Sequence, residues 1–196
     1  MAYELILAQS LSITLGDTIQ RYVVTIGLYL ASLGAGALAY AWIRDKFMAQ
    51  FAHVEALLSL LGGSAVILSI MFSKSMIMSF AVGHSLIVII GFLSGMELPM
   101  LIALAGGWKA SGPVVLCIDY IGSLLAAISF PYLFSSLGLV QLGFITAIAN
   151  LASGALYMPR NSKVAPIIYG LLSFLLLIGL YCWSHLEPYF MSRFYL

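Results

Sequence analysis

The sequence predicts an all-α integral membrane protein, a bundle of about six transmembrane helices with a short apolar helix before them. Composition is the first reason: 63% of the 196 residues are hydrophobic, 8% are charged, and the mean hydropathy is +1.10. Soluble proteins carry about 25% charged residues. The second reason is the repeated occurrence of apolar stretches near the length of about 20 residues that a spanning helix needs. We expect residues 1–196 to form a single transmembrane helical domain.

Six apolar stretches are long enough to cross a bilayer. They cover residues 22–43, 54–72, 76–104, 114–135, 139–158 and 164–183. The connections between them are short, so neighbouring helices should form antiparallel hairpins. The third stretch is too long for a straight crossing. Because Pro99 removes a backbone donor near its end, we expect a kink or a break around residues 97–99.

Residues 2–15 form a shorter apolar stretch that Glu4 interrupts. It is too short to cross a bilayer, which indicates a re-entrant or interfacial helix, or the remaining part of a helix whose start is absent. A cleavable signal peptide is not expected, because this segment lacks the basic residues that begin one.

The distribution of Lys and Arg predicts the orientation. The loops after the first, third and fifth stretches hold five of these residues and the opposite side holds three. This bias places the 105–112 loop in the cytoplasm and both termini outside, in a multi-pass protein of the cell inner membrane. Small residues three or four positions apart, as at Gly27, Ala31 and Gly34, indicate close helix packing.

Two carboxylates, Glu97 and Asp119, stand inside otherwise apolar spans. A charge there costs about 2.5–3.5 kcal/mol even on the gentlest scale, so it is rarely present without a partner or a function. Each lies seven to eight residues from the 105–112 loop, at similar depth on adjacent helices. They predict a cation or proton site. The alternative is structural: Glu97 binds loop amides, while Asp119 caps a turn or pairs with Lys109 or Arg44.

Five further polar residues are weaker candidates for a site: Glu4, Asp17, His84, Tyr120 and Asn150. Asp17 suits a helix cap. His84 suits a hydrogen-bonded packing position, and Asn150 suits an interhelical hydrogen bond. Tyr120 points about 100° away from its acidic neighbour on a helix.

Signatures of common enzymes and binding modules are absent from the sequence. There is no glycine-rich phosphate loop, no metal-ligand spacing among the three histidines, and no Ser/His/Asp arrangement. We therefore expect neither a metal nor a cofactor. No basic run suggests nucleic acid, and the lipid bilayer is the first expected partner.

Several motifs do resemble a known family. They are Tyr-Glu-Leu-Ile-Leu at 3–7, Leu-Gly-Asp at 15–17, the glycine-rich run 26–36, G-x-E-x-P at 95–99, D-Y-x-G at 119–122 within the run 119–134, and Ile-Ala-Asn-Leu at 148–151. This order resembles the membrane domain of membrane-bound spermidine synthases, the polyamine aminopropyltransferases. In that family a hydrophobic helical domain precedes a Rossmann-like synthase domain, and the membrane domain is similar to half of a major facilitator fold.

The resemblance implies a stand-alone membrane module, because these residues do not include the synthase domain. We do not expect aminopropyltransferase activity from them alone. The leading hypothesis is that the module binds or moves a small cation or polyamine through Glu97 and Asp119. The rival is a structural subunit that anchors a separately encoded synthase or packs against another membrane protein. A third alternative is a fragment without function.

Overall fold

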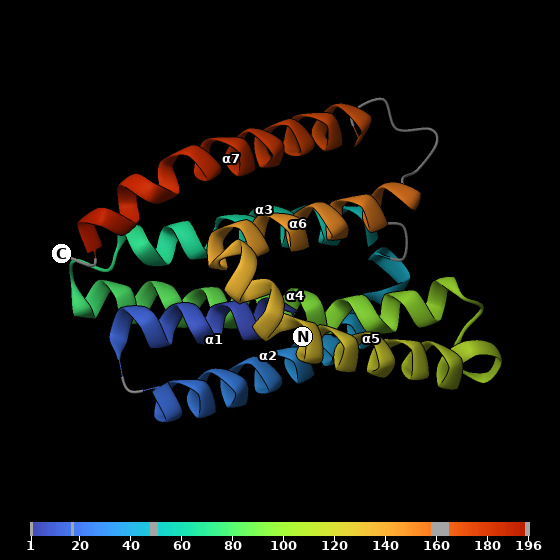
Figure 1. Cartoon of the computed structure of the whole chain (residues 1–196). Coiled ribbons are helices and arrows are strands. Elements are labelled where there is room, and N and C mark those ends of the chain that lie inside the picture. The colour runs from blue at the N-terminus through green and yellow to red at the C-terminus, as the bar shows by residue number, and fades with distance from the viewer. Residues whose placement is uncertain (1, 17, 48–50, 158–164, 195–196) are drawn as a thin grey trace.

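The computed structural model describes residues 2–16, 18–47, 51–157 and 165–194, and every regular element in these ranges is a helix. The seven helices are α1 Ala2–Leu15, α2 Thr18–Phe47, α3 Phe51–Met71, α4 Met76–Leu104, α5 Trp108–Leu137, α6 Leu139–Leu156 and α7 Ala165–Phe194. They lie side by side as an elongated bundle (Figure 1). Six are long and apolar enough to cross a membrane, as the sequence predicted.

Helix α1 lies in the middle of the bundle, in contact with α2, α3, α4 and α6. Its side chains Ile6, Leu7 and Leu11 are buried on all sides. The short apolar helix that the sequence predicted at the N-terminus is therefore packed inside the bundle. The apolar side chains of α1 are spread around the helix and do not form a single face, which suits contact with several neighbouring helices at once.

Helices α2 and α4 cross in close contact because two glycines meet there. A β-carbon at Gly36 would lie 1.9 Å from the Phe92 carbonyl oxygen, and one at Gly95 would lie 2.0 Å from that of Leu33. Gly27 and Gly34, two of the small residues that indicated close packing, face open space. Small residues do mediate the packing, but the contact uses a different face of α2.

Helix α4 runs without interruption from Met76 to Leu104 and includes Pro99. The break that the sequence suggested is absent, since α2 and α3 both pack along α4 and support it where the proline removes one hydrogen bond. The chain then turns sharply through Gly106 and Gly107, whose φ angles of +102° and +89° favour glycine.

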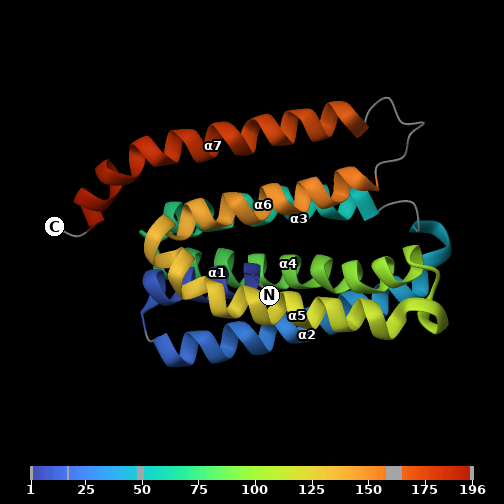
Figure 2. The same ribbon diagram turned by 45° about the vertical axis from the view of Figure 1, so that its right-hand side comes forward.

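Helices α5 and α7 lie at the periphery (Figure 2). Among the described residues of α5, only Gly112 is buried. Cys117 on α5 and Cys182 on α7 are free and exposed. In a bilayer these apolar surfaces can face lipid, which leaves α1, α2, α3, α4 and α6 to form the core.

Candidate polar site inside the bundle

Two carboxyl groups meet in the interior of the bundle, Glu97 of α4 and Glu55 of α3. They lie close enough to share a hydrogen bond, although neither Glu55 oxygen has a partner with full hydrogen-bond geometry. Glu55 is completely inaccessible to solvent, with 0% of its surface exposed. Glu55 stands about one turn from the start of α3 and Glu97 about two turns from the end of α4. Both therefore lie toward the end of the bundle that carries the 105–107 turn.

The surroundings of Glu55 come from α6 and α7. A β-carbon at Gly154 of α6 would lie 2.6 Å from the β-carbon of Glu55 and 2.3 Å from the Tyr169 hydroxyl of α7. Glycine is thus needed for Glu55 and Tyr169 to occupy this space. The Tyr169 hydroxyl donates a hydrogen bond to the Ala52 carbonyl of α3, and Ser153 lies within hydrogen-bonding reach of Glu55.

Two tyrosines extend the polar site toward α1 and α2. Tyr3 of α1 is buried, lies within electrostatic range of both Glu55 and Glu97, and has a hydroxyl without a hydrogen-bond partner. Its ring packs over Gly62, where a β-carbon would lie 2.2 Å from it. Tyr29 of α2 is also buried and stands within electrostatic range of Glu97.

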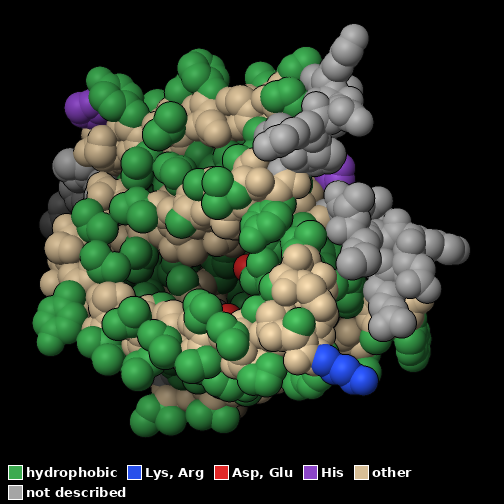
Figure 3. All heavy atoms as spheres, turned by 90° about the vertical axis from the view of Figure 1, so that its right-hand side faces the viewer, with side chains coloured by type: hydrophobic (Ala, Val, Ile, Leu, Met, Phe, Trp, Pro, Cys, Tyr) green, Lys and Arg blue, Asp and Glu red, His purple; other side chains and the backbone are tan. Residues whose placement is uncertain are grey.

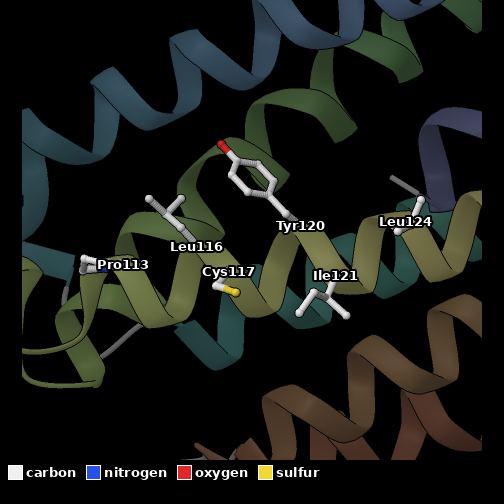
Figure 4. A pocket seen from close by; sticks show the side chains of 6 residues that line it. All are labelled: Pro113, Leu116, Cys117, Tyr120, Ile121 and Leu124. Atoms are coloured by element: carbon white, nitrogen blue, oxygen red, sulfur yellow. The ribbon is translucent and has the colours of Figure 1, made fainter.

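Asp119 of α5 borders this site without joining the pair. Its side chain is exposed, and it acts electrostatically on Glu97 and on Tyr29. The sequence prediction paired Glu97 with Asp119, whereas the structure places Glu55 directly against Glu97. Tyr120 is two-thirds exposed and lines a shallow apolar groove of about 530 Å³ along α5, where its ring points away from Ile121 (Figure 4).

A larger cavity lies between α2, α4 and α5. Its volume is about 780 Å³, and its lining residues on α4 run from Gly95 to Ala103 without including Glu97. The 105–107 turn borders it at the end of the bundle. On that end face a hollow surrounded by hydrophobic side chains shows acidic side chains in its depth (Figure 3). Acidic side chains can therefore be reached from this end of the bundle.

Among the described residues, the other candidates from the sequence form no hydrogen bond with the Glu55–Glu97 pair. Glu4 is buried on α1 and acts electrostatically on Tyr29. His84 lies on α4, where its Nδ1 meets the Phe80 carbonyl at 2.8 Å and its ring stacks on Phe80. Asn150 is half-buried on α6, and its backbone carbonyl accepts a hydrogen bond from Ser153. Asp17 lies outside the described residues.

In the described part of the chain, the charged side chains of the site are all acidic. All four carboxyl side chains described, Glu4, Glu55, Glu97 and Asp119, act on one of the buried tyrosines or on each other. The described residues show no Lys or Arg paired with Glu55 or Glu97. Within the same ranges, no group of three or more His, Cys, Asp or Glu is close enough to hold a metal ion.

Sequence reasoning missed Glu55. Glu55 stands next to the start of the predicted span 54–72. An acid in such a position is expected to lie at the membrane interface, where its side chain reaches water. The available signal was that Glu55 and Glu97 lie on consecutive antiparallel helices, each a short distance from the same end of the hairpin.

The chain is similar in sequence to polyamine aminopropyltransferases of several bacteria. The chain is 33% identical over 173 residues to a polyamine aminopropyltransferase of Leptospira interrogans, and 35% identical over 159 residues to polyamine aminopropyltransferase 2 of Ralstonia nicotianae. These alignments cover 84% and 78% of the chain. A polyamine aminopropyltransferase of Oceanobacillus iheyensis is 29% identical over an alignment that covers 98% of it.

The chain is a homologue of one part of the polyamine aminopropyltransferases. It spans only 31% to 40% of the length of these three relatives. No model of a protein family matches the chain, and no solved structure does. The predicted resemblance is confirmed: this aminopropyltransferase homologue is a multi-span membrane module related to the membrane part of those proteins.

Proposed function

We propose that the module binds a small organic cation of the polyamine class inside the bundle, at Glu55 and Glu97. The observation that carries the proposal is the meeting of these two carboxyl groups in an apolar interior. Buried acids are costly unless they are paired or perform a task. A protonated amine offers three N–H donors, enough to bridge both carboxyl groups.

The tyrosines support the same class of ligand. The Tyr3 hydroxyl is buried without a partner and can accept a hydrogen bond from an ammonium group. Aromatic rings also attract alkylammonium groups over their faces. Asp119, at the border of the site, is placed to meet a second positive charge of a longer cation. Polyamines carry several such charges along a flexible apolar chain, and the relatives' names refer to this class.

A ligand titration tests the proposal. The full chain in lipid nanodiscs would be titrated with spermidine and putrescine by calorimetry, with butane-1,4-diol as an uncharged control for putrescine. We expect binding of both amines, none of the diol, and at least about tenfold weaker binding for Glu97→Gln and Glu55→Gln. Asp119→Asn should weaken spermidine more than putrescine.

The matched control is Glu4→Gln, which makes the same acid-to-amide change on α1, where Glu4 acts on Tyr29. It should alter the affinity less than the change at Glu97 does. Absence of amine binding by the folded wild-type protein, or equal affinity in all variants, would refute the proposal.

The rival function, an anchor for a separate protein, rests on α5. All of its described residues except Gly112 are partly or fully exposed, so the helix has surface available for another protein. Cross-linking from position 121, at the groove along α5, would support this role if it captured a defined membrane or synthase partner in cells. Capture of lipid alone would argue against it.

A further inference from the structure

Ionisation of both Glu55 and Glu97 is electrostatically unfavourable unless a cation is bound between them. Two carboxylates side by side in an apolar interior repel each other, and burial disfavours both charges. Such pairs hold one proton between them when no cation is present. Glu55 and Glu97 lie within hydrogen-bonding reach of each other, and Glu55 is completely buried, so this pair is in that situation.

The groups that face the pair come from every helix packed around it. They are Tyr3 from α1, Tyr29 from α2, Asp119 from α5, Ser153 from α6 and Tyr169 from α7. Four of the five are neutral hydroxyl groups, and the fifth is a further acid. The amino terminus of the chain also acts electrostatically on Glu97, and no Lys or Arg among the described residues is paired with either carboxyl group.

An independent observation indicates an unfilled hydrogen-bonding position beside the pair. The Tyr3 hydroxyl is buried, stands within electrostatic range of both carboxyl groups, and has no hydrogen-bond partner. A buried hydroxyl normally finds a partner. An ammonium group between Glu55 and Glu97 would supply one.

We propose that this site exchanges a proton for the cation that it binds. In the empty state the pair carries one proton and one negative charge. When an ammonium group enters, the proton leaves from the Glu55–Glu97 pair to water through the hollow at the end of the bundle, and both carboxylates bind the ammonium. The charge of pair plus ammonium stays at one negative unit throughout, so neither state leaves a second uncompensated charge in the apolar interior.

The exchange makes the affinity for the cation depend on pH. Because binding releases a proton, the affinity for the cation rises with pH. The pH of the compartment that the hollow faces would then control how tightly the cation is bound. This inference rests on the proposed function, since a module that binds no cation has nothing to exchange.

Proton release can be measured directly. The full chain in nanodiscs, in weak buffer with a pH indicator dye, would receive putrescine from a stock adjusted to the same pH. We expect release of about one proton per bound amine. Calorimetry in two buffers with different ionisation enthalpies should give the same number.

Two variants make the test specific. Glu55→Gln leaves a single carboxylate, and at putrescine concentrations high enough to saturate it we expect almost no proton release. Asp119→Asn weakens binding but keeps the pair, so release per bound amine should equal that of the wild type.

The outcomes separate the two proposals. Amine binding without proton release overturns the exchange and leaves the proposed function intact. Release that persists in Glu55→Gln or disappears in Asp119→Asn also overturns it. No amine binding by the folded wild type overturns both.

Discussion

Glu55 of α3 lies against Glu97 of α4 in the interior of the bundle, although the two residues are far apart in the sequence. Gly154 and Tyr169 shape the space on the Glu55 side, and Tyr3 faces both carboxyl groups. Five different helices therefore contribute to one small polar site. Nothing in helix packing requires acids here, because apolar residues of similar size would fill the same volume.

The first prediction is that the buried carboxyl group of Glu55 lowers the free energy of unfolding. Glu55→Gln keeps the size of the side chain and removes one of the two neighbouring buried acids, so the free energy of unfolding should stay the same or rise by about 1 kcal/mol. Thermal unfolding in one detergent, followed by circular dichroism, measures this. Glu55→Ala is the comparison, because it leaves a cavity and should lower stability by about 2 kcal/mol or more. A large loss in Glu55→Gln would show that the carboxyl group has a structural role.

The second prediction concerns the contact of α2 with α4. Gly95→Val would drive side-chain atoms into the Leu33 carbonyl, since even a β-carbon would lie 2.0 Å from that oxygen. We expect the helices to separate and the unfolding free energy to fall by about 3 kcal/mol or more. Gly34→Val on α2 is the control, because a β-carbon there meets nothing within 4 Å. Equal melting temperatures for both variants would contradict the close contact.

The sequence predicted the number and the approximate ends of the spanning helices, because apolar length alone determines them. It did not predict that α1 is central, since the position of an evenly apolar helix depends on its neighbours. The same holds for α2, where Gly36 rather than Gly34 meets α4. A face of small residues is visible in the sequence, but the direction in which it points is not.

The candidate site was predicted only in part. Glu97 was found because an acid deep in a span is conspicuous. Glu55 was missed because its position near a helix end resembles a solvated one, and its burial depends on α6 and α7, which follow much later in the chain. The partner expected for Glu97, Asp119, lies on the exposed helix α5 and only borders the site.

The third prediction is the orientation of the bundle. In a variant without Cys117 and Cys182, a cysteine at position 109 should react with a membrane-impermeant maleimide only in inside-out vesicles. A cysteine at position 74, in the connection between α3 and α4, should react only in right-side-out vesicles. This result would place the hollow near the 105–107 turn on the cytoplasmic side, as the excess of Lys and Arg predicts. The reverse labelling pattern would show that the site opens outward.

The fourth prediction tests whether Gly154 holds the site open. In Gly154→Ala the new methyl group would stand 2.3 Å from the Tyr169 hydroxyl and 2.6 Å from the Glu55 β-carbon, so both side chains must shift. We expect spermidine to bind about tenfold more weakly, since displacement of Glu55 opens the carboxyl pair. Gly143→Ala, on the same helix, is the control, because its β-carbon would meet its neighbours at an ordinary 3.7 Å.

Adding Tyr169→Phe to Gly154→Ala should restore part of the lost affinity. Removal of the hydroxyl relieves one of the two collisions, so the two changes should be non-additive, with a coupling of about 0.5–1 kcal/mol. Tyr169→Phe alone loses the hydrogen bond to Ala52 and should weaken binding slightly. If the double variant binds no better than Gly154→Ala, the collision with Tyr169 does not control the position of Glu55.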